Sequence, residues 1–382
     1  MTITDSIKQI LTVSIKPRTD AYTDQYSRIF MVKLTMVGAL LVGLNWYTDK
    51  ITCIQPGALG ISEVFVGQAC WINGLYIFRD LRYRNDEVAY FGVPRDIRMD
   101  GMYADGTLCA TQDTSLRHNP KCIPMKKTFY LEFQYMCFVI AGLGILYYAP
   151  YAFHRLVNSD IVSLKGSVAE CNPDAIVKNY FNYKINPRSK LRTRVIGHVM
   201  IKIFYIIINI VAFIGTDIVL GGNYRNYGLK WVTWSKDEND VMFEYIEARQ
   251  GPKPGNYLLP SFGFCSLQEA SQDIKFLITN KHKLVCELSQ HILYQYVFLL
   301  FWFCMIFGII ISTTGFLLTV TNYVITIFTL MSNGGKGRRL CRRITLRECE
   351  YLEFIRRKNL VLYGAVFHRL RGMKDGHHLE DI

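Results

Sequence analysis

Four long apolar runs separate five more polar segments of the chain. A helix needs about 20 apolar residues to cross the roughly 30 Å hydrocarbon core of a bilayer. The runs predict transmembrane helices over residues 29–47, 131–153, 201–222 and 292–320. The expected fold is therefore an all-α membrane protein with four transmembrane helices per subunit.

The fourth apolar run is longer than one crossing needs, because it stays uncharged from Ile292 to Met331. We expect one span to about Thr319, followed by a helical continuation. A fifth crossing is the alternative interpretation. The polar residues 319–322 argue against it, since they leave no room for a turn between two full spans.

The distribution of Lys and Arg predicts the orientation. Residues 154–202 carry nine basic and three acidic side chains, and residues 331–382 carry twelve and six. The other two connections are balanced, with nine and eight in 51–128 and eight and eight in 224–291. We therefore expect an N-terminal segment (1–28), a middle loop (154–200) and a tail (321–382) in the cytoplasm. A first loop (48–130) and a second loop (223–291) are expected outside.

The net charge of +13 follows mostly from this orientation signal. No compact basic domain with interleaved aromatic residues indicates a nucleic-acid partner. The sequence also lacks a phosphate-binding loop, an H-E-x-x-H motif and a G-x-S-x-G motif, so we expect neither an enzyme nor a cofactor.

The eleven cysteines divide by predicted compartment. An even number in the two outer loops is typical of disulfides in an oxidising space. Six cysteines allow fifteen pairings, and the residues alone do not choose among them. A metal site is the competing interpretation, but no C-x-x-C pair or His-rich set accompanies them, so no metal is expected. The six loop cysteines are Cys53, Cys70, Cys109, Cys122, Cys265 and Cys286.

Several motifs resemble the innexins, the invertebrate gap-junction proteins. Residues 70–76 are similar to the family's C-W-[IV]-x-G-[TS]-[YF], and residues 51–53 to its P-I-x-C. The aromatic run 298–303 and the Y-Y-A-P sequence at 147–150 resemble two further family motifs. The resemblance covers about residues 1–330. The motif residues that it singles out are Trp71, Gly74, Gln134, Pro150 and Trp302.

Two departures identify a divergent member of that family. The family's Y-Y-Q-W-V-P signature aligns with residues 132–137, where only Gln134 and an aromatic residue after it are kept. Cys137 replaces a proline that would kink the helix, so we expect a straighter second span. The first loop is also longer than usual and contains the extra Cys109 and Cys122.

The resemblance implies a pairing of the cysteines and a function. Cys53 would bond to Cys286 and Cys70 to Cys265, while Cys109 and Cys122 would close a local loop. Eight subunits would form a ring that passes ions and small molecules across the plasma membrane. Docking with an opposing hemichannel would join neighbouring cells at a gap junction. The alternatives are a large-pore channel that does not dock and a four-span adhesion or scaffold protein without a pore.

The N-terminal segment is the first candidate for lining a pore, as it does in innexins. Its residues Ile3, Ile7, Ile10 and Leu11 have helical spacing, which would face the first span. The polar face would then offer Thr2, Ser6 and Gln9 to permeant ions. A helix on the membrane surface and a disordered tail are the alternatives.

Charged residues near the ends of the spans are weaker candidates. Lys33 would line the pore or extend its ammonium group to the cytoplasmic interface. Glu132 and Asp217 lie near the outer ends of their spans, which explains them without a pore role.

The tail contains a basic stretch at residues 336–343 that predicts attraction to anionic membrane lipid. Apolar positions between Leu346 and Phe367 have helical spacing. We expect the tail and the middle loop to form a helical cytoplasmic dome, as in innexins.

Overall fold

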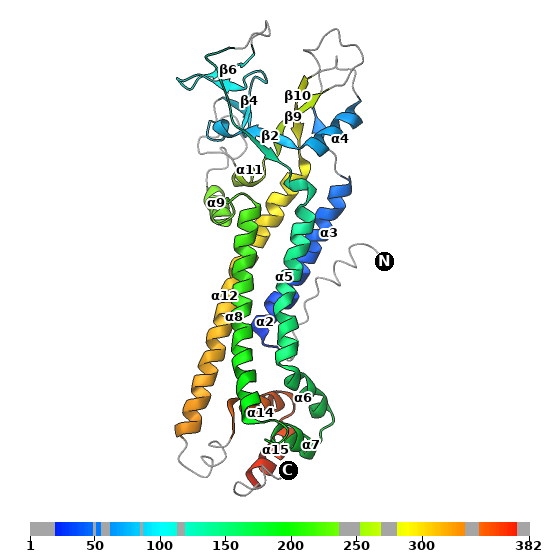
Figure 1. Cartoon of the computed structure of the whole chain (residues 1–382), viewed down its shortest axis with the longest axis vertical. Helices are drawn as coiled ribbons and strands as arrows, with labels where there is room; N and C mark the ends of the chain where they lie inside the picture. Colours follow the sequence, from blue (N-terminus) through cyan, green and yellow to red (C-terminus); the bar gives the residue numbers. More distant parts are fainter. Residues whose placement is uncertain are drawn as a thin grey trace. The chain divides into compact units, whose positions relative to one another are not determined.

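The computed structural model describes residues 20–48, 51–54, 62–84, 87–112, 119–236, 253–268, 281–332 and 344–372. Helices make up most of the described chain (Figure 1). The chain forms two compact units, and each is built from separate stretches of sequence. The helical unit combines residues 1–34, 143–212 and 305–382, and the sheet unit combines residues 35–142 and 213–304.

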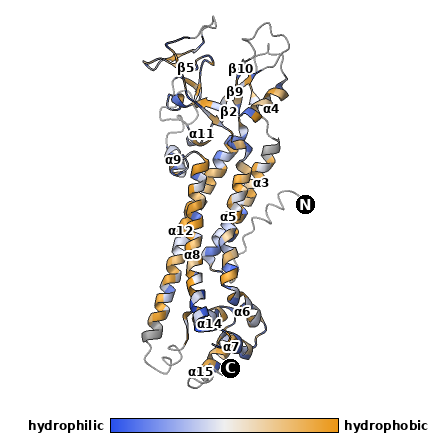
Figure 2. Ribbon diagram, viewed as in Figure 1, coloured by the Kyte–Doolittle hydropathy of each residue, from blue (hydrophilic) through white to orange (hydrophobic). Residues whose placement is uncertain are grey.

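Among the described residues, four helices are long and apolar enough to cross a membrane, as the sequence predicts. They cover Tyr22–Leu44, Met136–Val157, Arg188–Val219 and Ser289–Phe328, and hydrophobic residues dominate them in Figure 2. Only 33–39% of each apolar window is buried within the chain. The remaining apolar surface requires lipid or other subunits around it.

The observed helices extend beyond the apolar runs. The first begins at Tyr22 as α2 (Tyr22–Gln25), passes through the π-helix η1 (Tyr26–Met31) and continues as α3 (Val32–Thr48). The third, α8 (Arg188–Val219), starts well before residue 201. Both extensions carry charged side chains, which end an apolar run without ending a helix. The second helix is α5 (Met136–Val157).

The fourth helix, α12 (Ser289–Ser332), is continuous over 44 residues. The polar stretch 319–322 therefore lies inside a helix and does not form a turn. Thr319 and Thr321 donate their hydroxyl hydrogens to the carbonyl oxygens of Gly315 and Leu317, each at 2.8 Å. These bonds to the preceding turn satisfy the hydroxyl groups within the helix itself.

Short helices from the middle loop and the tail share one core in the helical unit. The helices are α6 (Ser159–Ala169), α7 (Pro173–Tyr180), α14 (Leu346–Lys358) and α15 (Leu360–Gly372). Asn172 caps α7, and Thr345 and Glu348 form a capping box at the start of α14. The shared core includes Ile161, Leu164, Ile176, Phe181, Tyr351, Ile355, Leu362 and Val366.

The two loops of the sheet unit form a five-stranded sheet, which we call the loop sheet. The all-α prediction is therefore wrong for this part of the chain. The strand order is β1-β10-β9-β2-β8. The strands are β1 (Thr52–Cys53), β2 (Leu75–Phe78), β8 (Lys127–Tyr130), β9 (Phe262–Gln268) and β10 (Lys281–Glu287).

Smaller elements surround the loop sheet within the same unit. β3 (Val88–Tyr90) pairs with β4 (Val93–Pro94), and β5 (Gly101–Met102) lies between β6 (Leu108–Cys109) and β7 (Ile123–Pro124). The short helices are α4 (Glu63–Asn73), η2 (Arg79–Leu81), η3 (Glu132–Gln134), α9 (Tyr227–Trp234) and α11 (Pro254–Leu258).

Candidate functional site

The loop sheet joins segments that are far apart in the sequence. Strands β1, β2 and β8 come from the first loop, and the hairpin of β9 and β10 comes from the second. Every neighbouring pair is antiparallel, and the second-loop hairpin lies between β1 and β2. The two loops therefore fold as one body, with neither able to form this sheet alone.

Aromatic side chains pack tightly against the loop sheet. The rings of Tyr76 and Phe264, which come from different loops, have centroids 5.7 Å apart. Phe78 lies 5.7 Å from the same Phe264 ring. Phe78 and Phe264 are fully buried and Tyr76 nearly so, which makes these contacts between loops a hydrophobic core.

A lysine is held over this aromatic cluster. The ammonium group of Lys283 lies 4.1 Å from the centroid of the Phe264 ring and donates a hydrogen bond to the carbonyl oxygen of Ile97 at 2.7 Å. Burial lowers the pKa of Lys283 to about 8, although the nearby carboxylate of Asp100 opposes the shift. The hydrogen bond ties the first loop to β10.

Two disulfides cross-link the loop sheet. Cys53 of β1 is bonded to Cys286, its partner in the register of β10. Cys70, in the last turn of α4, is bonded to Cys265 of β9. All four residues are buried. This is the pairing that the resemblance implies, and each bond closes a very long segment of chain, which restricts the unfolded state.

The sulfur atoms of Cys53, Cys70 and Cys286 all lie within 4.8 Å of one another. Such a cluster would suit a soft metal if the sulfurs were thiolates. Each of these sulfurs is instead part of a disulfide. Their proximity therefore reflects two neighbouring cross-links.

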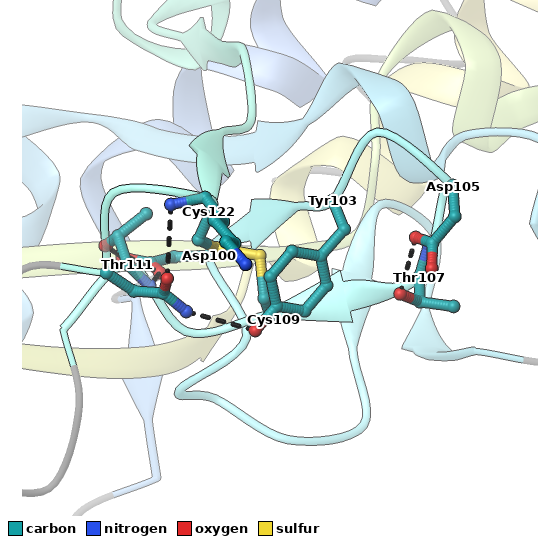
Figure 3. Close-up of a disulfide and its surroundings, with 9 residues drawn as sticks. Asp100, Tyr103, Asp105, Thr107, Cys109, Thr111 and Cys122 are labelled. Atoms are coloured by element: carbon teal, nitrogen blue, oxygen red, sulfur yellow. Dashed lines mark hydrogen bonds between the residues drawn. A yellow bond between two sulfur atoms is a disulfide. The ribbon is translucent and has the colours of Figure 1, made fainter.

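The third disulfide, Cys109–Cys122, stabilises a separate small sheet formed by β6, β5 and β7 (Figure 3). Its two cysteines are only 13 residues apart. The carboxylate of Asp100 accepts hydrogen bonds from the backbone N–H and the hydroxyl of Thr111, both at 2.8 Å. A Cβ atom at Gly101 would lie 2.4 Å from the sulfur of Cys122, so glycine allows the strand to approach the disulfide.

The motif residues near Cys70 connect α4 to the start of α5. Gly74 ends α4 with φ +77°, and a Cβ there would lie 2.6 Å from Leu131. Both observations require glycine. Gln134 donates a hydrogen bond from its amide nitrogen to the carbonyl oxygen of Trp71 at 2.6 Å. These contacts fix the helix that presents Cys70 to β9.

Trp302 has a comparable role on α12. Its indole nitrogen donates a hydrogen bond to the carbonyl oxygen of Arg225 at 2.9 Å. A Cβ atom at Gly228 would lie 2.1 Å from its ring, so α9 packs its backbone directly on the tryptophan. Trp302 thus fastens α9 to a membrane-spanning helix.

Two proline positions were singled out in the second span. Pro150 is buried inside α5. Cys137, which stands where the family has a proline, is the second residue of α5. The first turn of a helix tolerates proline without a kink. The substitution therefore gives no reason for a straighter helix, contrary to the expectation from sequence.

Of the four predicted pore-lining residues, only Lys33 lies within the described residues. Thr2, Ser6 and Gln9 lie outside the described residues, so their role stays a prediction. The basic stretch 336–343 is outside them as well. Lys33 is the second residue of α3 and is half-buried.

Sequence reasoning missed a buried group of charges in the helical unit, which we call the ion-pair cluster. Lys202 of α8 contacts the carboxylate of Asp24 at 2.5 Å, and Arg28 contacts that of Asp20 at 2.8 Å. Each of the four side chains is at most 9% exposed. The cluster therefore ties the start of the first helix to α8.

A signal for this cluster exists in the sequence. Asp20, Asp24 and Arg28 recur every four residues, which would place them on one side of a helix. The prediction treated residues 1–28 as a polar segment before the span. The pairing with Lys202, however, depends on the fold.

A second buried charge network, which we call the tail clamp, joins the tail to the middle loop. Arg347 of α14 is completely buried and makes two hydrogen bonds to the carboxylate of Asp160 on α6, at 2.9 and 2.7 Å. Arg194 of α8 reaches the same carboxylate at 2.9 Å, and the hydroxyl of Tyr351 also donates to it. Burial disfavours the charged carboxylate, but the bonds from Arg347 outweigh this and lower the pKa of Asp160.

One protein-family model matches most of this chain. The innexin family model matches residues 20–359. The matched range contains all four membrane-spanning candidates, the six loop cysteines and α14. No curated protein matches the chain.

Proposed function

Because the chain belongs to the innexin family, we propose that it is a subunit of a large-pore channel. The channel passes ions and small molecules across the plasma membrane, or between cells as a gap junction. The family match over residues 20–359 carries this proposal. Transport is passive diffusion down existing gradients, with selectivity set by pore width and by the charges that line the pore.

The pore requires several subunits, because four helices are too few to enclose a wide channel. The exposed apolar surface of the four candidate spans supports assembly in the membrane. We propose a ring of eight subunits, the number that the resemblance to innexins implies. We further propose that the helices of the middle loop and the tail, held together by the tail clamp, form a dome at the cytoplasmic mouth.

Both chain ends lie in the cytoplasm in this proposal. The excess of Lys and Arg in the middle loop and tail supports this orientation. The three disulfides, all in the two loops, favour an oxidising outer space for those loops. Cys171 in the middle loop is a free and exposed thiol that provides a test.

The orientation is tested by labelling with a membrane-impermeant maleimide. A variant with Cys341 and Cys349 replaced by serine keeps Cys171 as the exposed thiol of the predicted cytoplasmic segments. We expect labelling of Cys171 only after the cells are permeabilised. A C171S version is the control, and labelling of Cys171 in intact cells would contradict the orientation.

The N-terminal segment is proposed to line the pore, with Thr2, Ser6 and Gln9 facing permeant ions and Lys33 near the entrance. The ion-pair cluster supports a defined position for the residues just before α2. Asp20 pairs with Arg28, and Asp24 pairs with Lys202 of α8. These two ion pairs fix the position of the chain at Asp20, from which the N-terminal segment extends.

The loop sheet is proposed as the surface that docks with a channel on a neighbouring cell. Its two disulfides and aromatic core support a preformed surface, which lowers the entropic cost of docking. The small sheet closed by Cys109–Cys122 adds structure to the first loop, which favours a partner with the same addition.

Dye uptake and single-channel recording in cells that express only this chain test the channel itself. We expect conductance and dye entry under depolarisation and low external calcium. Persistent absence of both, with the protein present at the cell surface, would leave the adhesion or scaffold alternative. Recording between paired cells then separates the two channel types, because hemichannel current without junctional current would exclude docking.

A further inference from the structure

The connection from α8 to α9 is firmly held. Gly221 and Gly222 follow the end of α8 and adopt φ +70° and +80°, the left-handed conformation that commonly ends a helix. The carboxylate of Asp217 accepts hydrogen bonds from the backbone N–H groups of Tyr224 and Arg225 at 2.9 and 3.1 Å. The helix α9 therefore has a fixed position just beyond a membrane-spanning helix.

One side of α9 is fastened to the first part of a second spanning helix, the portion of α12 up to Cys304, which belongs to the same unit. The hydroxyl of Tyr227 donates to the carbonyl oxygen of Gln295 at 2.9 Å. Gly228 packs on Trp302, as described above. Contacts with both α8 and α12 therefore fix the position of α9.

The other side of α9 exposes apolar side chains. Leu229 is 58% and Val232 40% exposed, and their spacing of three places them on one face of the helix. On the last turns of α8, Ile214 and Ile218 are 42% and 72% exposed. The apolar surface of a spanning helix is therefore followed, across the turn, by the apolar face of α9.

Two lysines lie on aromatic rings beside this face. The ammonium group of Lys253 is 4.6 Å from the ring centroid of Tyr296 and 5.2 Å from that of Trp231, and it donates to the hydroxyl of Tyr296 at 2.9 Å. The ammonium group of Lys230 is 5.6 Å from the ring centroid of Tyr257. Within the described part of the chain, no carboxylate forms an ion pair with either lysine. Both cations therefore remain able to bind an anion.

We propose that α9 is an interfacial helix whose exposed face, together with Lys230 and Lys253, binds phospholipids of the membrane that the chain spans. Leu229 and Val232 would contact the upper part of the acyl chains, and the two lysines would contact lipid phosphates. Aromatic rings and lysines concentrate at the boundary between hydrocarbon and water, where each has an apolar body and a polar tip. This assignment does not depend on whether a pore opens.

Phospholipid suits this surface better than a second copy of the chain. The exposed apolar face of α9 follows the exposed apolar end of α8 along the chain, and the apolar surface of α8 already requires lipid or another apolar cover. The two lysines favour an anionic group next to the apolar face. A phospholipid has both an anionic phosphate and apolar acyl chains in one molecule. Contact between subunits at this face is the competing outcome of the test.

Photo-crosslinking distinguishes lipid from protein at this face. Benzoylphenylalanine replaces Leu229 or Val232 in the full-length protein, reconstituted in vesicles of phosphatidylcholine and phosphatidylserine. The matched control replaces Ile123, which is 63% exposed on β7 in the same unit. We expect adducts with the mass of one phospholipid at the two α9 positions and none at Ile123. Crosslinks to a second copy, or no lipid adduct at α9, would overturn the proposal.

Charge reversal tests the role of the lysines. In a background with the photo-reactive group at Val232, the variants K230E and K253E should reduce the phospholipid adduct several-fold, because an added carboxylate repels the lipid phosphate. K121E, at an exposed lysine of the small sheet, should leave it unchanged. Unchanged adduct yields in K230Q and K253Q as well as in the glutamate variants would refute lysine binding. The three disulfides, mapped by mass spectrometry, report that each variant is folded.

Discussion

The loop sheet and the ion-pair cluster each hold together segments that lie far apart in the sequence, but they use different interactions. The loop sheet uses two disulfides over an aromatic core, whereas the ion-pair cluster uses buried charges between helices. Removing a disulfide leaves no buried charge behind, whereas removing one member of a buried ion pair leaves the other charge unpaired.

This difference predicts how each region responds to a mutation. A disulfide acts mainly by restricting the unfolded chain, with a contribution of about 2–4 kcal/mol to stability. A buried ion pair contributes little net stability, but removing one partner costs about 3–5 kcal/mol because a charge is left buried and unpaired. The helical unit should therefore be more sensitive to single changes of charge than the sheet unit is to loss of a disulfide.

The largest effect is expected for K202M in the ion-pair cluster. It leaves Asp24 buried without its cation, so the free energy of unfolding should fall by about 3–5 kcal/mol. Thermal melting of the purified protein measures the loss. The double variant D24N/K202M should recover much of it, since no charge remains unpaired. A double variant as unstable as the sum of its singles would show that the two groups do not interact.

Removing one disulfide of the loop sheet is the next test. C70A/C265A should lower the free energy of unfolding by about 2–4 kcal/mol, because the two loops lose a cross-link. Each single variant leaves one free thiol within or beside the sulfur cluster, where it can exchange with Cys53–Cys286. Mapping of disulfides by mass spectrometry should show exchange in C265A and none in the double variant. A free energy of unfolding far lower in the double variant than in either single variant would contradict the pairing.

A smaller effect is expected where α9 packs on α12. G228A adds a Cβ atom that would lie 2.1 Å from the ring of Trp302, so the ring or the helix must shift. Such overpacking costs about 1–3 kcal/mol. The control is G215A on α8, where a Cβ atom meets nothing within 4 Å and alanine favours the helix. Equal melting temperatures for the two variants would argue against the tight contact.

The smallest effect is a pH dependence at Lys283 in the loop sheet. Its pKa is about 8 in the folded protein and about 10.4 when unfolded. Below pH 8 the lysine is charged in both states, and the folded protein bears the full cost of burying the charge. Between pH 8 and about 10.4 only the unfolded state keeps the proton, so stability rises with pH.

Comparing K283M with the unchanged protein isolates this contribution. The melting temperature of the unchanged protein, relative to that of K283M, should be higher at pH 9.5 than at pH 7.5. The expected gain is on the order of 1–2 kcal/mol. K121M serves as an exposed control with no such change. A constant difference between the two pH values would mean that Lys283 does not lose its proton in this range.

Hydropathy could predict the four spans because each exceeds the length that a bilayer requires. It could not predict the loop sheet, since β1 has two residues and β2 and β8 have four each. Strands this short carry too little alternation to recognise, and their pairing depends on contacts between the two loops. The resemblance to a family supplied the disulfide pairing that the spacing of six cysteines left open.

The buried charges were missed for a related reason. The prediction counted Lys202 and Arg347 as basic residues of segments expected in the cytoplasm and did not identify their partners. Arg347 meets Asp160 only because the tail folds back on the middle loop, 187 residues away in sequence. A one-dimensional count of charge cannot distinguish a buried arginine from a solvated one.

The small sheet closed by Cys109–Cys122 shares no strand with the loop sheet. Its cross-link begins and ends within the first loop, 13 residues apart, so it imposes no condition on the strands that join the two loops. The length and surface of this module can therefore change without altering the strand pairing that joins the two loops. The same independence makes the module a natural place to insert a foreign epitope or to exchange segments between related chains.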